Sequence, residues 1–299
     1  MKKLIPVILS CAMLLAACGS SASTDSVAAS SEAASAESTA ASSEAAESTA
    51  ETSELAGTTL KVAASPTPHA EILNVAKEIL AEQGIDLEVV EFSDYVQPNL
   101  VTENGEVDAN YFQHTPYLDS FNEENGTHLV SVGAVHYEPF GIYPGKSDDL
   151  ANIADGATIA VPNDATNEAR ALQLLAAQGL IEINPDAGLN ATPNDITSNP
   201  KNLEFTELDA SMIANTIEEF DLNVINSNYA LQAGLNPAED ALVSEDADSD
   251  AAQTYANIIA VKAGHENDPA IVALVDALHS EAIQDFINTT YQGSVLPID

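Results

Sequence analysis

Arg170 is the only arginine in a chain that has eight Lys and Arg residues against 47 Asp and Glu residues. Its guanidinium group offers a planar fork of donors that can bind a carboxylate through two hydrogen bonds. Asn226 stands at the end of an apolar run and offers an acceptor that suits an ammonium group. An exposed helix position for Arg170 and a turn role for Asn226 are the alternatives.

Aromatic residues cluster in one stretch of the chain. The protein has eight Tyr and seven Phe, and nine of these fifteen lie between Phe92 and Tyr143. We expect some of them to form the core of one lobe. Three stand beside polar and proline residues at the ends of predicted strands, where loops present side chains to a cleft. These three, Tyr95, Phe112 and Tyr117, are predicted to line a pocket.

The histidines permit two kinds of role. His114 lies among the predicted pocket residues, and we expect it to hydrogen bond to a ligand; ordering its loop is the alternative. His69 is expected to cap the helix that follows it. His136 and Glu138 lie two apart on a predicted strand and therefore on one face. A metal site would need a third ligand there, such as His114 or His128, so no metal site is predicted.

Enzyme motifs are absent in convincing form. The sequence contains no Gly-x-Ser-x-Gly, no His-Glu-x-x-His and no Cys-His pair, because the mature chain keeps a single cysteine. Gly145-Lys146-Ser147 resembles the end of a phosphate-binding loop but lacks the earlier glycine. We therefore expect neither an enzyme nor a cofactor.

Charge narrows the class of ligand. The formal net charge is −39 at pH 7, so the surface repels phosphate backbones and nucleic acid is not an expected partner. Free anions are also repelled at long range. A zwitterion is not, provided that its binding site supplies a local cation.

The N-terminus has the pattern of an exported lipoprotein. Two lysines precede an apolar run that is too short to span a bilayer, and Leu15-Ala16-Ala17-Cys18 resembles the lipobox of bacterial lipoproteins. Residues 1–17 are predicted to be a signal peptide and Cys18 to carry the lipid. Residues 18–56 are Ser, Ala, Thr and Glu with almost no large apolar residue, which predicts a disordered acidic tether. The protein would be anchored to the cell membrane on its extracytoplasmic face.

The rest of the chain alternates β-branched runs with helical patterns, which favours an α/β fold with mostly parallel sheets. Strands are predicted at residues 60–64, 85–92, 107–112, 129–143, 158–161, 203–208, 222–226 and 256–262, and helices include 69–83, 167–178 and 269–279. The length predicts two lobes with a ligand cleft between them. Lobe I would comprise residues 57–137 and 253–299, and lobe II residues 138–252. The chain crossings are expected near residues 134–143 and 250–259.

Four segments carry a resemblance to a known family: Glu91–Asn99, Asp108–Leu118, Val161–Leu172 and Val224–Ala230. They resemble, in the same order, signature segments of the NlpA/MetQ family of methionine-binding lipoproteins. The resemblance runs from about Leu60 to Ile298. It implies a two-lobed fold like that of type II periplasmic binding proteins, which captures L-methionine and delivers it to the permease and ATPase subunits of an ABC importer.

The resemblance also implies the roles of individual residues. Those matching Tyr95, Phe112, His114 and Tyr117 enclose the ligand side chain, and those matching Arg170 and Asn226 hold its head group. Asn163 and Asn167 are further candidates. Aromatic rings around a thioether agree with this assignment, because they discriminate by shape and by contacts to sulfur.

The sequence departs from the family pattern beside Arg170. Glu168 stands where an apolar residue is common and Ala169 where glycine is common, while residues 211–216 lack a frequent proline-arginine pair. A carboxylate near the head group could change which amine-bearing ligand fits. Another apolar amino acid or a methionine-containing dipeptide therefore remains an alternative ligand, and a surface interaction lipoprotein remains an alternative class.

Overall fold

The computed structural model describes residues 55–247 and 253–298. The predicted signal peptide, Cys18 and most of the predicted tether lie outside these residues. Leu55 packs against a hydrophobic core, so the folded part begins slightly before the predicted end of the tether at residue 56. Within the described ranges, none of the helices is both long enough and apolar enough to span a membrane.

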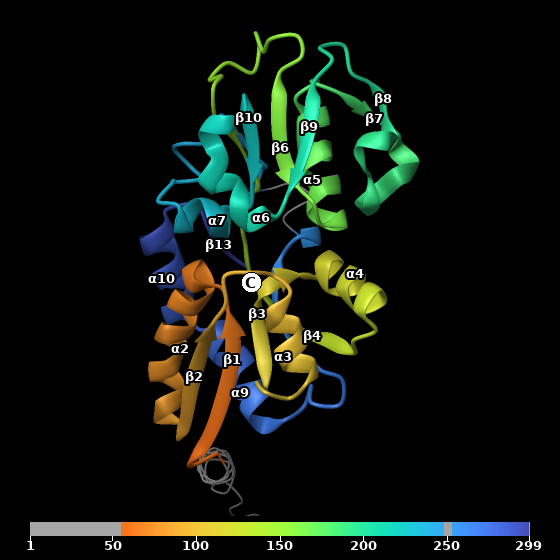
Figure 1. Ribbon diagram of the computed structural model, residues 1–299. Coiled ribbons are helices and arrows are strands. Elements are labelled where there is room, and N and C mark those ends of the chain that lie inside the picture. The colour runs from red at the N-terminus through yellow and green to blue at the C-terminus, as the bar shows by residue number, and fades with distance from the viewer. Residues whose placement is uncertain (1–54, 248–252, 299) are drawn as a thin grey trace, which may run out of the picture. The chain divides into compact units, whose positions relative to one another are not determined.

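The larger sheet has six strands in the order β13-β4-β12-β3-β1-β2. We call this sheet and its helices lobe I (Figure 1). β1 pairs in parallel with β2 and β3, whereas β12 is antiparallel to β3 and β4. The bounds of the strands are β1 Thr58–Ala64, β2 Ile85–Glu91, β3 Ala109–His114, β4 Leu129–Tyr137, β12 Asn257–Lys262 and β13 Leu296–Pro297.

Helices cover both faces of the lobe I sheet. Successive residues of a strand point to opposite faces, and in β12 Ile259 joins the core under α2, α9 and α10, whereas Ile258 joins the smaller core under α4. Burial on both faces explains why β3 is buried along its whole length. The helices are η1 Pro66–Ala70, α2 Glu71–Glu82, α3 Gln97–Glu103, α4 Thr115–Asn125, α9 Pro269–Leu278 and α10 Glu281–Tyr291.

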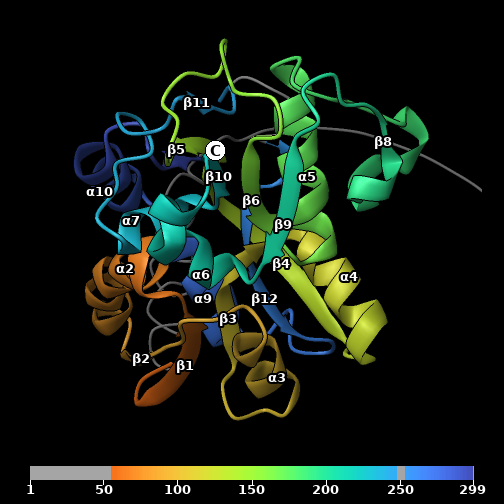
Figure 2. The ribbon, with the colours of Figure 1, turned by 45° about the horizontal axis from the view of Figure 1, so that its top comes forward.

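The second sheet, which defines lobe II, has five strands in the order β11-β5-β10-β6-β9. Figure 2 shows β10, β6 and β9 side by side. α5 packs on one face over a core that includes Leu172 and Val161, and α6, η4 and α7 cover a second core around Ile225. The bounds are β5 Gly141–Pro144, β6 Thr158–Pro162, α5 Ala165–Ala177, β9 Glu204–Leu208, α6 Ala210–Ile213, η4 Ala214–Glu219, β10 Leu222–Ile225, α7 Ser227–Gln232 and β11 Val243–Ser244.

A small appendage extends lobe II after α5. Two short strands pair antiparallel in a sheet of their own, and two short 3₁₀ helices lie between them in the chain. These elements are β7 Glu182–Ile183, η2 Pro185–Asn190, η3 Pro193–Asp195 and β8 Ile196–Ser198.

The chain leaves lobe I after β4 and enters lobe II at β5, so the first crossing is only residues 138–140. It returns between β11 and β12, and part of this return lies outside the described residues. The strands of the six-stranded sheet lie within residues 57–137 and 253–299, and those of the five-stranded sheet lie within residues 138–252. We keep residues 57–137 with 253–299, and 138–252, as the proposed extents of the lobes.

Three expectations about the elements were wrong. Antiparallel pairs join β12 to β3 and β4, and β5 to β10 and β11, so the sheets are mixed rather than mostly parallel. The predicted strand 129–143 is two strands in different sheets, because Pro139 has no N–H for a ladder and the N–H of Phe140 donates to Glu245. His69 does not cap α2; the N-cap is Ala70, and the His69 ring bonds Asn257 instead.

Candidate functional site

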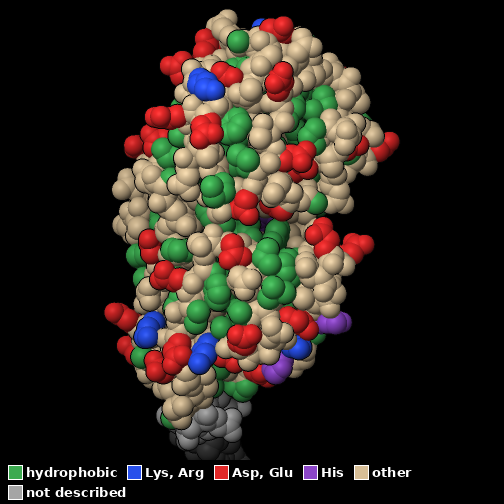
Figure 3. Space-filling model, in the orientation of Figure 1, with side chains coloured by type: hydrophobic (Ala, Val, Ile, Leu, Met, Phe, Trp, Pro, Cys, Tyr) green, Lys and Arg blue, Asp and Glu red, His purple; other side chains and the backbone are tan. Residues whose placement is uncertain are grey.

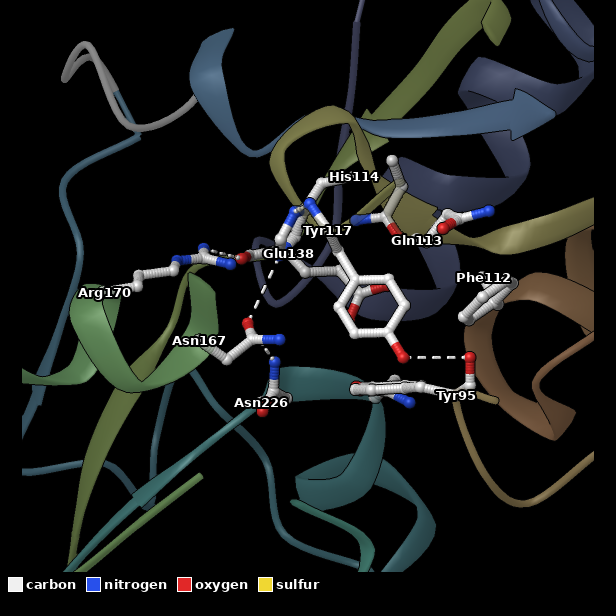
Figure 4. A pocket seen from close by; sticks show the side chains of 11 residues that line it. Tyr95, Phe112, Gln113, His114, Tyr117, Glu138, Asn167, Arg170 and Asn226 are labelled. Atoms are coloured by element: carbon white, nitrogen blue, oxygen red, sulfur yellow. Dashed lines mark hydrogen bonds between the residues drawn. The ribbon is translucent and has the colours of Figure 1, made fainter. Parts of the chain in front are cut away.

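Lobe I presents a group of aromatic side chains and one histidine at the ends of β2 and β3. Phe112 and His114 are two apart in β3 and so share a face, while Tyr117 lies in the first turn of α4. His114 is the N-cap of α4: its Nδ1 accepts a hydrogen bond from the N–H of Tyr117 at 3.2 Å. The Tyr117 hydroxyl in turn donates to the carbonyl oxygen of Tyr95 at 3.1 Å (Figure 4). The loop that carries the rings is thus fixed by its own polar contacts.

The rings pack across the boundary between the lobes. The Tyr95 ring centroid lies 5.8 Å from that of Phe112, 5.7 Å from that of Tyr117 and 4.9 Å from that of Tyr229 in α7. The Tyr95 hydroxyl donates to Asn228 Oδ1 at 2.6 Å, and the Tyr229 hydroxyl donates to the carbonyl of Ser93 at 3.2 Å. Tyr95 therefore belongs to the aromatic group of one lobe and is hydrogen bonded to the other.

Lobe II presents polar side chains from the starts of α5 and α7. Asn167 and Arg170 are three apart on α5 and so lie on one face of that helix. Asp164 caps the helix by accepting from the N–H of Asn167 at 3.0 Å, and its carboxylate also accepts from the Asn167 side chain. Asn226 follows β10 and is the N-cap residue of α7. Both amides therefore stand where a strand ends and a helix begins.

Asn167 joins the two lobes through one atom. Its Oδ1 accepts from His114 Nε2 at 3.2 Å and from Asn226 Nδ2 at 2.9 Å (Figure 4). Because His114 Nδ1 is already an acceptor, the proton must be on Nε2. Burial lowers the pKa of His114 to about 3, and the charge of Arg170 acts in the same direction. His114 is therefore neutral at physiological pH and serves both to order its loop and to contact lobe II.

Arg170 is buried and paired with Glu245. Its Nε donates to Glu245 Oε1 at 2.8 Å, and its Nη2 donates to Glu245 Oε2 at 2.5 Å and to the carbonyl oxygen of Glu138 at 2.9 Å. The guanidinium carbon lies 4.3 Å from the ring centroid of Tyr255. Burial alone would lower the pKa of Arg170, but Glu245 outweighs it and raises the pKa. The donor fork is thus already occupied by a protein carboxylate, and none of these three bonds uses Nη1.

Seven of the predicted ligand-binding residues line one pocket between the lobes. Four further lining residues were not predicted to bind a ligand: Gln113, Glu138, Asn228 and Asn257. The cavity volume of this pocket is about 20 Å³, which is room for about one water molecule. Two buried amide atoms of the pocket lining have no hydrogen-bond partner in the described part of the chain, the acceptor Asn226 Oδ1 and the donor Asn228 Nδ2. Buried amides without partners cost free energy, so these two atoms mark where a ligand could bind.

Seven of the eight predicted ligand-binding residues come together here: Tyr95, Phe112, His114, Tyr117, Asn167, Arg170 and Asn226. Asn163 does not. It is exposed in the loop between β6 and α5, one residue before Asp164, the N-cap of α5. Contact of these seven side chains with a ligand stays a prediction.

A family model for the NlpA lipoprotein family matches residues 60–299, which is nearly all of the folded part. The chain belongs to the NlpA lipoprotein family.

Members and solved structures agree with this placement. The methionine-binding lipoprotein MetQ of Bacillus subtilis is 46% identical over 241 residues, covering 79% of this chain and 87% of the relative. A nutrient-binding protein from Burkholderia cenocepacia, solved bound to methionine, is 41% identical with a TM-score of 0.77, covering 80% of this chain and 100% of that one. A crystal structure from Ruminococcus gnavus is 59% identical with a TM-score of 0.80, covering 81% and 99%.

In this NlpA-family chain, sequence reasoning missed two residues at or beside the pocket because their hydrogen-bond partners lie far along the chain. Glu245 is 75 residues from Arg170, and Asn257 is 188 residues from His69. Glu138 was considered only as a metal ligand. Its position beside His136 was a usable signal, because a carboxylate inside an apolar run needs a partner or a ligand.

The predicted absence of a metal site was based on a missing third ligand beside His136 and Glu138. Neither candidate fills that place: His114 is at the pocket, and the side chain of His128 is 74% exposed and contacts Glu103. The structure instead brings His69 to them, and all three side chains are buried.

Proposed function

We propose that this protein is the substrate-binding lipoprotein of an ABC importer, which captures L-methionine outside the cytoplasm and delivers it to the permease. The single observation that carries the proposal is the pairing of an unsatisfied acceptor, Asn226 Oδ1, with an unsatisfied donor, Asn228 Nδ2, in a pocket walled by aromatic rings. An α-amino acid has a donor and an acceptor on one carbon. Methionine adds a flexible thioether that aromatic rings accommodate well.

The charges around the pocket suit a zwitterion. Arg170 supplies the cation near the ligand carboxylate, although Glu245 takes two of its donors and only part of the guanidinium faces a ligand. Glu138 lines the pocket and can accept from an ammonium group beside Asn226. Burial raises the pKa of the Glu138 carboxyl, and a ligand ammonium would oppose that change by stabilising the carboxylate.

Capture needs the lobes to separate. The space now open in the pocket is far smaller than an amino acid, and the polar contacts Tyr95–Asn228 and His114–Asn167 close it. We propose that the cleft opens by bending at residues 138–140, the crossing from β4 to β5. The ligand then replaces part of the contacts that hold the lobes together.

The membrane anchor and the transport partners complete the proposal. Cys18 would carry lipid and hold the protein on the extracytoplasmic face, and separate permease and ATPase subunits would move the ligand. The strongly acidic composition fits an extracytoplasmic protein that takes up a zwitterion, and acidic side chains are spread widely over the face drawn in Figure 3.

Calorimetric titration of the mature chain in detergent, freed of bound ligand, tests the proposal. L-Methionine is the first ligand, followed by D-methionine, leucine and glycyl-methionine. We expect the tightest binding for methionine. The Asn226→Ala variant removes an acceptor from a charged group, which costs about 1.5–3 kcal/mol or roughly 10- to 150-fold in affinity.

Asn163→Ala is the matched control, since it makes the same chemical change in an exposed residue outside the pocket. Its affinity for methionine is expected to equal that of the wild type. Tighter binding of leucine or glycyl-methionine would show that methionine is not the preferred ligand, while the protein would still be a substrate-binding protein. If no amino acid or peptide bound, the result would contradict the assignment as a substrate-binding protein and would favour a surface interaction protein.

A further inference from the structure

A buried cluster of two histidines and one glutamate lies beside the pocket at the junction of the lobes. His69 follows β1 in η1, His136 is near the end of β4, and Glu138 begins the crossing into lobe II. His136 Nε2 lies 2.8 Å from Glu138 Oε1, and His69 Nε2 lies 3.3 Å from the same oxygen. The side chains of His69 and His136 are 1% and 0% exposed and that of Glu138 is 7%.

We propose that His69, His136 and Glu138 form a binding site for a divalent transition metal of the Zn²⁺ class. Two imidazole nitrogens and one carboxylate oxygen are a ligand set that zinc favours, and imidazole ligands disfavour Mg²⁺ and Ca²⁺. Their three ligand atoms lie within 4.8 Å of one another. Ligands at about 2.0–2.2 Å around a tetrahedral ion stand about 3.3–3.5 Å apart, so small side-chain adjustments would admit the ion.

Neighbouring groups complete the site. Asn257 Oδ1 lies 2.9 Å from His69 Nε2, so this oxygen is placed to be the fourth ligand of the metal. The second nitrogen of His136, Nδ1, is hydrogen bonded to the hydroxyl of Tyr111, which fixes the orientation of the ring. Such outer contacts orient metal-binding histidines and tune their basicity. Burial also keeps both imidazoles neutral, which is the form that binds metal.

The position of the cluster provides an entry path. All the proposed ligands belong to lobe I or to the start of the crossing, so the site does not require the lobes to be closed. α7 of lobe II packs against η1, which carries His69, and Glu138 faces the pocket. Separation of the lobes would uncover the cluster from the pocket side.

The test is a titration of the mature chain in detergent with ZnCl₂ after treatment with a chelator. We expect one equivalent of Zn²⁺ to bind, and the Glu138→Gln and His69→Gln variants to weaken this binding by at least about 100-fold. The matched control is the double variant His128→Gln, His265→Gln. It removes the two exposed histidines that contact carboxylates and is expected to bind like the wild type.

A second measurement uses the unaltered chain, so it does not depend on whether a variant folds. Co²⁺ bound in place of Zn²⁺ is examined by visible and X-ray absorption, and the expected spectrum is that of a four-coordinate ion with two imidazole ligands. The absence of a binding step, equal binding by the two cluster variants, loss of binding only in the double variant, or a coordination shell of oxygen alone would each overturn the proposal.

Discussion

Replacement of Glu245 by glutamine is expected to destabilise the folded protein strongly. Glu245 accepts four hydrogen bonds: two from Arg170 at 2.8 and 2.5 Å, one from the Tyr137 hydroxyl at 2.5 Å and one from the N–H of Phe140 at 3.0 Å. Every donor points at a carboxylate oxygen. A glutamine side chain keeps one oxygen and turns an NH₂ group toward donors, so Arg170 becomes a buried cation without its counter-charge.

The size of the effect follows from burial. The side chains of Arg170 and Glu245 are 4% and 9% exposed, and removal of one partner of a buried ion pair costs about 3–5 kcal/mol. The free energy of unfolding of a protein is typically about 5–15 kcal/mol, so the loss is a large part of the total. In urea this corresponds to a fall of about 1–2 M in the unfolding midpoint.

Urea unfolding of the ligand-free mature chain, followed by circular dichroism, measures this change. Glu88→Gln makes the same substitution in an exposed pair, in which Glu88 lies 3.5 Å from Lys61 and both side chains are about half exposed. That control is expected to lose less than about 1 kcal/mol. Equal losses in Glu245→Gln and Glu88→Gln would refute the reasoning, because net charge and not the buried pair would then set the stability.

Three further changes test other parts of the structure. Tyr95→Phe removes one hydrogen bond between the lobes, which costs about 1 kcal/mol, so calorimetry should find methionine bound roughly fivefold more weakly; unchanged affinity would argue against this contact as a latch. Burial and the neighbouring carboxylate of Glu207 raise the pKa of Glu168 to about 7. Because the folded pKa is raised, stability is complete below about pH 4.5 and falls as the pH rises through about 7, so Glu168→Gln should exceed the wild type by about 1–2 kcal/mol at pH 8 and not at pH 4; parallel stability curves would contradict this. Gly145→Ala would push a methyl group against the carbonyl oxygen of Phe220 and cost about 1–3 kcal/mol in urea unfolding; an unchanged midpoint would show that the turn can shift at no cost.

Much of the fold could be predicted from the sequence because its signals are local. Apolar spacing places α2 and α9 close to their observed bounds, and β6 and β12 lie within a residue or two of the expected strands. Strand direction carries no such signal. β12 inserts between β3 and β4 and is antiparallel to both, and a β-branched run reads the same in either orientation.

The candidate site was predictable for the same reason and to the same extent. Tyr95, Phe112 and Arg170 stand out by residue type and neighbours, and all three line the pocket. The meeting of His69 with His136, and of Arg170 with Glu245, depends on which strands become neighbours in space. Periodicity does not encode that information, so the partners of the recognised residues were the part that sequence reasoning missed.

The short crossing after β4 has a consequence for engineering the protein. Residues 138–140 connect the lobes, and Glu138 among them lines the pocket. The carbonyl of Glu138 accepts from Arg170, that of Pro139 accepts from the Ser227 hydroxyl, and the N–H of Phe140 donates to Glu245, the partner of Arg170. A biosensor design that loosens this segment to enlarge the optical response to lobe closure would also dismantle the recognition surface. Signal amplitude and selectivity cannot be tuned separately there, and reporter groups belong on surfaces away from the crossing.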